Sequence, residues 1–198
     1  MSSSLTGSLL QMLGGDVMNQ LGAQLGADPA TTQKAVGAAL PLLMGALGKN
    51  ASSTDGASSL LNALTKDHDG SVLNDLSGFV SRGGNLQDGN GILRHTLGSN
   101  RSGIESALSQ ASGLSADSTS NLLAMLAPVV MGALGQQTRQ QGLDVNGLAQ
   151  LLMGEKQHAT SQLGGLAGLL DMNHDGSILD EVVNIGSKLL GGLFGGKN

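Results

Sequence analysis

One eight-residue phrase occurs twice in this chain, and the repetition limits what the chain can fold into. Residues 41–48 read Pro-Leu-Leu-Met-Gly-Ala-Leu-Gly, and residues 128–135 read Pro-Val-Val-Met-Gly-Ala-Leu-Gly, an offset of 87. The same offset relates Val17 to Ile104. A duplicated unit of this size usually folds as two copies of one supersecondary structure that pack together. The repeat therefore predicts two tandem copies, and it argues against a single asymmetric active site.

A second shared phrase follows each copy of the first. Residues 67–71 read Asp-His-Asp-Gly-Ser and residues 173–177 read Asn-His-Asp-Gly-Ser, an offset of 106, so the second copy is longer. Glycine, asparagine and aspartate crowd residues 83–90, which makes this stretch the clearest break in the chain. We therefore predict a first helical repeat at 1–86 and a second, with a longer insert and a C-terminal helix, at 87–198.

The hydrophobic pattern predicts helices throughout. Apolar residues recur every three or four positions, no window alternates with period two for long, and β-branched runs are missing. Asp28 and Ser115 are good N-cap residues for the helices that contain Pro41 and Pro128. Proline lacks an N–H group and crowds the preceding turn, so it should kink each helix. The expected fold is all-α: two short-helix bundles packed together, each with a Pro-kinked central helix.

Composition excludes several classes of function. The formal charge is −5, so the chain lacks the excess of cations that binding to nucleic acid requires. There is no cysteine, which excludes disulfides, thiolate catalysis and Cys-ligated zinc. Two Phe are the only aromatic residues besides histidine, so stacking platforms for bases or sugars are not expected.

Membrane and export signals are weak. No stretch of 18 apolar residues suggests a transmembrane helix, and the N-terminus lacks the basic and long apolar regions of a signal peptide. We therefore expect a cytoplasmic protein. The C-terminal stripe could lie on a membrane surface or pack on the second copy; few cations and two nearby acids favour packing. The stripe consists of Ile178, Val182, Ile185, Leu189 and Leu193.

The best candidate for a chemical site is the acidic segment 171–181. Its positions 1, 3 and 5 carry side-chain oxygens and its position 6 is glycine, as at the start of a calcium loop. Position 12 is Val182 instead of a bidentate glutamate, so an acid just before it would have to substitute. The candidate Ca²⁺ ligands are Asp171, Asn173, Asp175, Asp180 and Glu181.

The first copy carries a weaker version of this site, formed by Asp67, Asp69 and Asp75. The alternative is structural: Asp-Gly-Ser forms a turn, and Ser71 or Ser177 caps the helix that follows. We favour capping for the first loop and leave both interpretations open for the second.

Catalytic patterns are missing. The sequence has no Gly-x-Ser-x-Gly elbow and no glycine-rich phosphate loop with its lysine. A transition-metal site would need several histidines to converge, and no pair stands at ligand spacing; the histidines are His68, His95, His158 and His174. We therefore expect a protein that is not an enzyme, with a hydrolase built from converging Asp and His residues as a distant alternative.

The order of the motifs resembles a known family. An Asp- or Ser-capped helix with Leu-Pro or Ala-Pro, then Asp-His-Asp-Gly-Ser and the phrase Gly-Asn-Gly-Ile-Leu-Arg-His-Thr-Leu-Gly at 89–98, is similar to the YidB-like bacterial family, domain of unknown function 937. The resemblance covers nearly the whole chain, although the second copy is longer than a single-unit pattern. It implies a helical fold and brings no established reaction.

Two functions remain as hypotheses. The first is a non-enzymatic bacterial module for protein interaction or assembly, with a protein partner or self-association. The alternative is a calcium-binding protein that uses the acidic segment 171–181.

Overall fold

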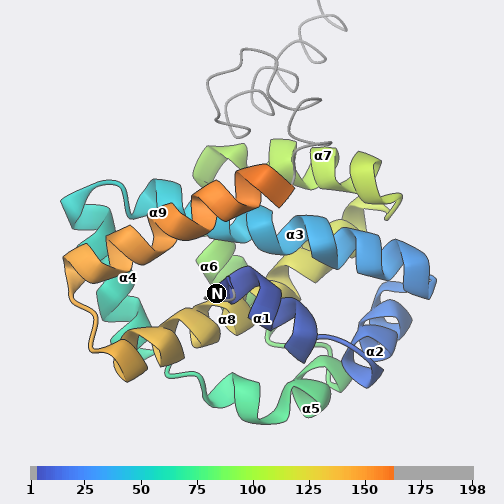
Figure 1. Ribbon diagram of the computed structural model, residues 1–198. Helices are drawn as coiled ribbons and strands as arrows, with labels where there is room; N and C mark the ends of the chain where they lie inside the picture. Colours follow the sequence, from blue (N-terminus) through green and yellow to red (C-terminus); the bar gives the residue numbers. More distant parts are fainter. Residues whose placement is uncertain (1–3, 163–198) are drawn as a thin grey trace, which may run out of the picture.

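The computed structural model describes residues 4–162, and every regular element in this part of the chain is a helix (Figure 1). The elements are α1 (Leu5–Met12), α2 (Asp16–Leu25), α3 (Pro29–Asn50), α4 (Thr54–Lys66), the 3-10 helix η1 (Ser71–Asp75), α5 (Leu76–Ser81), α6 (Leu86–Leu97), the 3-10 helix η2 (Gly98–Asn100), α7 (Arg101–Ser112), α8 (Ala116–Gln141) and α9 (Val145–Gln162). The all-α prediction is confirmed.

The chain contains two successions of a shorter helix, a long helix and a further helix. They are α2, α3 and α4, and later α7, α8 and α9. Gly26 and Gly113 end α2 and α7 in the left-handed conformation, with φ of 65° and 86°. Asp28 then caps α3 by accepting from Ala30 N–H at 2.9 Å, and Ser115 caps α8 in the same way. Both predicted N-caps are therefore observed, because each offers a side-chain oxygen to the free amides of a first turn.

Pro41 lies inside α3 and Pro128 lies inside α8, as the sequence predicts, and each helix continues beyond its proline. Thirteen of the 22 residues of α3 are buried, as are sixteen of the 26 residues of α8. This burial makes α3 and α8 the centre of the fold.

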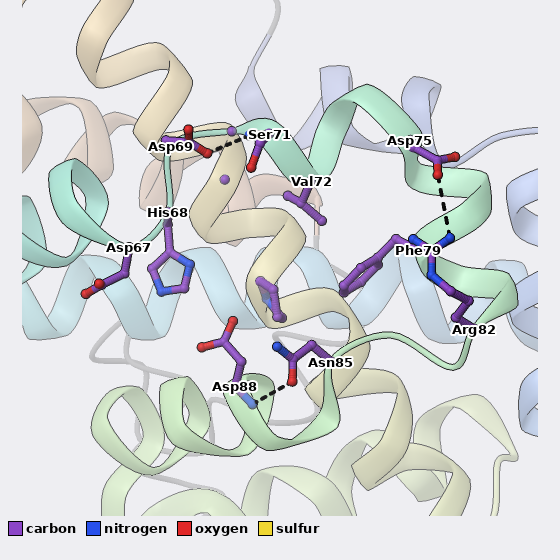
Figure 2. Close-up of a pocket in the computed structure, with 13 residues that line it drawn as sticks. Asp67, His68, Asp69, Ser71, Val72, Asp75, Phe79, Arg82, Asn85 and Asp88 are labelled. Atoms are coloured by element: carbon purple, nitrogen blue, oxygen red, sulfur yellow. Dashed lines mark hydrogen bonds and ion pairs between the residues drawn. The ribbon is translucent and has the colours of Figure 1, made fainter.

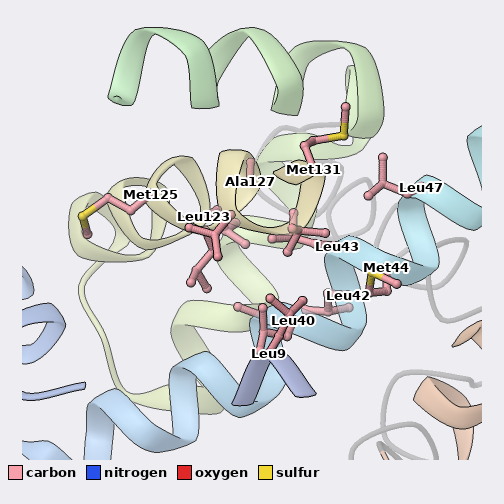
Figure 3. Packing of buried hydrophobic residues seen from close by; sticks show 14 of the residues in the cluster. Leu9, Leu40, Leu42, Leu43, Met44, Leu47, Leu123, Met125, Ala127 and Met131 are labelled. Carbon is pink, nitrogen blue, oxygen red and sulfur yellow. The ribbon is translucent and has the colours of Figure 1, made fainter. Parts of the chain in front are cut away.

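One hydrophobic core joins helices from both sides of the predicted 86/87 boundary. Figure 3 shows Leu123 and Ala127 of α8 in the same cluster as Leu40 and Leu43 of α3, with Leu9 of α1 beside them. All five side chains are at most 2% exposed. Each long helix is therefore buried by partners from the other half of the chain as well as from its own.

The last glycine of each repeated phrase lies where two helices cross. A Cβ atom at Gly48 of α3 would lie 3.3 Å from the Leu152 carbonyl oxygen of α9. A Cβ atom at Gly135 of α8 would overlap the His68 carbonyl oxygen and lie 3.1 Å from that of Leu64 in α4. The repeated glycines thus let α9 cross α3 closely and α4 cross α8 closely, which interlocks the two halves.

Among the described residues, one helix is long and apolar enough to cross a membrane, judged by length and composition alone. This helix is α8, and 83% of its most apolar window is buried inside the protein. A central helix of a protein core passes the same test, so the finding carries little weight for a membrane location.

Candidate functional site

Two adjoining hollows lie between α4, α6 and α8. The larger, which we call the α4–α6 groove, has a volume of about 930 Å³ and runs between α4 and α6 over Met131 of α8. The smaller, which we call the loop pocket, has a volume of about 300 Å³ and lies between residues 67–72, α5 and α8 (Figure 2). Asp67, His68, Asn85 and Asp88 line both hollows.

The Asp-His-Asp-Gly-Ser phrase forms a turn that packs against α8. Asp69 Oδ1 accepts a hydrogen bond from the Ser71 N–H at 2.9 Å. Gly70 has φ of 88°, and a Cβ atom there would lie 3.0 Å from Gln136 Cβ and 3.1 Å from the Gly132 carbonyl oxygen. Only glycine suits both the backbone conformation and the space, so the glycine of the phrase is explained by packing.

The hydrogen-bond pattern corrects the role that the sequence suggested for Ser71. The N-cap position of η1 is Gly70, and no side chain caps this 3-10 helix. Hydrogen bonds from the Ser71 hydroxyl and N–H, with a smaller contribution from the charge of Arg139, hold the pKa of Asp69 below its usual value of 3.8. Asp69, and not Ser71, is the hydrogen-bond acceptor of this turn.

The three acids proposed as a weaker metal site have separate roles. Asp67 is the C-cap residue of α4 and faces the hollows, whereas Asp69 belongs to the turn. Asp75 caps α5 by accepting from Gly78 N–H at 2.8 Å, and its carboxylate lies 3.8 Å from Arg82. Among the described residues, no three His, Asp or Glu side chains are grouped to hold a metal ion. All three acids line the loop pocket, but they are not grouped closely enough there to ligate one ion.

The stronger calcium candidates of the second copy lie outside the described residues. They are Asp171, Asn173, Asp175, Asp180 and Glu181. Calcium binding by this segment stays a prediction from the sequence.

The α4–α6 groove combines an apolar floor with an acidic rim. Its floor contains the buried side chains of Leu47, Leu60 and Met131 and the half-buried side chains of Ala63 and Ile92. Its rim carries three carboxylates, and among the residues that the structure describes no lysine or arginine lines the groove. The rim residues are Asp55, Asp67, Asp88, Asn50, Asn85, Gln87, His68 and His95. The groove thus has a surface for apolar side chains beside three carboxylates.

The walls of the groove are fixed by local contacts. Asn85 caps α6 by accepting from Asp88 N–H at 3.2 Å. Gly89 lets α6 approach α8, because a Cβ atom there would lie 2.9 Å from Ala124 Cα and closer still to its carbonyl group. At the other end, Asn50 Nδ2 donates to the His95 carbonyl oxygen at 3.2 Å and ties α3 to α6. Because these contacts fix both ends of α6, they also fix the position of the groove wall that α6 forms.

His68 and His95 both line the α4–α6 groove. Figure 2 shows the His68 ring directed toward the start of α6, near Asn85 and Asp88. His95 is an exposed residue of α6, and its Nδ1 is 2.9 Å from the Gly91 carbonyl oxygen. The two rings give the groove hydrogen-bonding groups at two separate points.

One buried carboxylate was not identified from the sequence. Glu155 of α9 is 7% exposed and accepts from Leu5 N–H at 2.7 Å, Thr6 N–H at 3.2 Å and Thr6 Oγ1 at 2.9 Å. It therefore accepts hydrogen bonds from the free amides at the start of α1, where a negative charge is favoured. The signal in the sequence was a glutamate at the helical spacing of Leu148 and Leu152, inside an apolar stripe.

The chain matches one family model. A family model described as a bacterial protein of unknown function (DUF937) matches residues 7–137 and 138–198. No curated protein and no solved structure matches the chain. The resemblance inferred from the motifs is confirmed, and the match brings no reaction or partner with it.

Proposed function

Because the chain belongs to this bacterial family of unknown function (DUF937), we propose its function from the geometry and chemistry of the α4–α6 groove. We propose that the protein is a non-enzymatic interaction module that binds an apolar, positively charged segment of a partner protein between α4 and α6. The observation that carries the proposal is a groove of about 930 Å³ lined by apolar side chains and three aspartates, with no lysine or arginine from residues 4–162.

The chemistry of the groove favours a peptide segment over a small substrate. Burying the apolar side chains of a partner on Leu60, Ile92 and Met131 supplies affinity, at roughly 25 cal/mol per Å² of apolar area before the costs of association. The rim carboxylates select for lysine or arginine, because complementary charge sets specificity and the rate of encounter. An amphipathic helix with a few cations meets both requirements, as in other helix-in-groove complexes.

We also propose that the two halves are copies of one unit. In α4 and α9, Leu60, Leu64 and Asp67 correspond by position to Leu148, Leu152 and Glu155, an offset of 88. Glu155 reaches the start of α1, whereas Asp67 faces the space before α6. In this proposal, the groove lies in the half of the chain where Asp67 does not repeat the contact that Glu155 makes with the start of a helix.

A designed peptide tests the binding proposal. The probe is a helix-forming peptide of leucine and lysine, and a leucine–glutamate peptide of equal length is its control. We expect the lysine peptide to bind with 1:1 stoichiometry in calorimetry and to shift the NMR signals of Leu60, Ile92 and His95. Equal binding of both peptides, or shifts confined to other surfaces, contradicts the proposal.

Charge reversal in the rim supplies the matched variant. Asp55→Lys combined with Asp88→Lys should weaken the lysine peptide by about ten-fold, because two attractive contacts become repulsive. Asp117→Lys is the control, since Asp117 is also an acid in the first turn of a helix but lies outside the groove. An equal loss in the control would mean that only net charge matters.

The alternative proposal is calcium binding by the segment 171–181, and it rests on the order of oxygen-bearing residues there. Lacking the glutamate at position 12, the loop should bind Ca²⁺ weakly, with Kd on the order of 10⁻⁴–10⁻³ M. Ca²⁺ would then raise the melting temperature by mass action, and Asp175→Ala would abolish the increase. A melting temperature indifferent to Ca²⁺ at about 10 mM contradicts this alternative.

A further inference from the structure

The α4–α6 groove has a candidate occupant in the same chain. We propose that residues 182–197 bind in this groove in cis and that a partner must displace them. This inference rests on the proposed function, because it assigns an occupant to the same groove.

The sequence of the segment complements the groove. Residues 182–197 contain apolar side chains at helical spacing, two lysines, and no aspartate or glutamate; the lysines are Lys188 and Lys197. The groove offers a floor of Leu47, Leu60, Ala63, Ile92 and Met131 and a rim with three aspartates. Apolar side chains and cations in one segment thus meet apolar side chains and carboxylates in one groove.

The chain is long enough for this contact. Helix α9 extends to Gln162, and residues 163–181 connect it to the proposed segment. A connection of this length spans at most about 60 Å when fully extended. A folded body of the size of residues 4–162 is about 40 Å across. The connection can therefore reach the α4–α6 groove from the end of α9.

The tether favours the segment of the same chain over that of a second copy. A linked segment has an effective concentration on the order of 1 mM, far above typical protein concentrations in solution. With an intrinsic Kd of about 0.1 mM, the groove would be about 90% occupied in cis. An external segment would then bind about ten-fold more weakly than it would to an empty groove.

Spin labelling of the full-length chain tests this inference directly. The chain has no cysteine, so Ser187→Cys introduces a single site for a nitroxide label within the proposed segment. We expect the label to broaden the amide signals of Leu60, Ile92 and His95 in the same molecule. Signals of α2, which does not line the groove, serve as the internal reference.

Mixed samples separate the possible occupants. Broadening that persists on dilution, and is absent when labelled ¹⁴N chains are mixed with unlabelled ¹⁵N chains, supports binding in cis. Broadening seen only in the mixed sample identifies a second copy and overturns the inference. An absence of broadening at the groove overturns it too, and the external lysine peptide then decides separately whether the groove binds a partner.

Charge reversal in the full chain supplies the second measurement. Lys188→Glu with Lys197→Glu should reduce the broadening and strengthen binding of the external lysine peptide by about ten-fold, because the competing segment is weakened. Lys34→Glu, on the exposed face of α3, should change neither quantity. If the double variant binds the peptide no more tightly than the parent chain, residues 182–197 do not occupy the groove.

Discussion

The helix crossing at Gly135 gives the sharpest prediction about stability. Gly135→Ala adds one methyl group where α4 crosses α8. The new Cβ atom would overlap the His68 carbonyl oxygen and lie 3.1 Å from the Leu64 carbonyl oxygen. Both obstacles are backbone atoms, one in the last turn of α4 and one just after it, so the methyl group can be accommodated only if this segment and α8 move apart.

The size of the effect follows from two opposing contributions. Alanine is favoured over glycine within a helix by about 0.8–1 kcal/mol. Forcing an extra carbon into a packed interior typically costs about 1–3 kcal/mol and can cost more when backbone must shift. Because backbone atoms obstruct the new methyl group at Gly135, we expect a net loss of about 1–3 kcal/mol. At roughly 3 °C per kcal/mol for a domain of this size, the melting temperature should fall by about 3–9 °C.

Gly45 provides the matched control in α3. A Cβ atom at Gly45 meets nothing within 4 Å, so Gly45→Ala keeps the gain in helix propensity without the clash. Its melting temperature should rise by about 2–4 °C. Gly48 is intermediate, because its Cβ would lie 3.3 Å from the Leu152 carbonyl oxygen.

Circular dichroism with thermal and urea denaturation measures these three variants. The expected order of stability is Gly45→Ala above the parent chain, with Gly48→Ala next and Gly135→Ala lowest. If Gly135→Ala were as stable as the parent, or if Gly45→Ala lost as much stability, the close helix crossing would not be the reason for glycine in the repeated phrase.

Three further predictions concern other features of the fold. Glu155→Ala should lower the free energy of unfolding by about 2–4 kcal/mol in urea titrations, because buried N–H and O–H donors at the start of α1 lose their acceptor; Glu155→Gln should lose less. Gly70→Ala should destabilise the protein more than Gly142→Ala, since both have positive φ but only Gly70 is crowded, and equal losses in thermal melts would refute this. In NMR titrations the pKa of Asp69 should lie below 3.8 and rise in Ser71→Ala; its contribution to stability is present above pH 3.8 and is lost as the pH falls through the lowered pKa.

Local features of the fold could be predicted from the sequence. Asp28 and Ser115 can be predicted as N-caps because a side-chain oxygen just before an apolar helix can accept a hydrogen bond from a free amide of its first turn. The apolar pattern continues on both sides of Pro41 and Pro128, and this pattern predicts that both lie inside helices. These signals lie within a few residues of one another, which is the range over which a sequence pattern determines backbone conformation.

Tertiary features could not be predicted in the same way. The glycine of the Asp-Gly-Ser phrase suggested a metal loop, but a positive φ at Gly70 serves a packed turn equally well. Only the position of α8, and of Gly132 on it, separates the two. The α4–α6 groove is lined by Asp55, Asp67 and Asp88, which lie far apart in the sequence. No spacing along the chain therefore predicts that they share one groove. The partner of Glu155 lies 150 positions away, at Leu5.

That last separation has a consequence for synthesis on the ribosome. Helix α1 is made first, yet Glu155, which accepts its free amides, is made near the end of the described chain. At about 5–20 residues per second, the start of α1 waits roughly 8–30 s for this partner. Helix α9, which covers α3, emerges equally late. The nascent N-terminal half therefore exposes apolar surface for most of translation, and the protein gains its native packing only when the second half has left the ribosome.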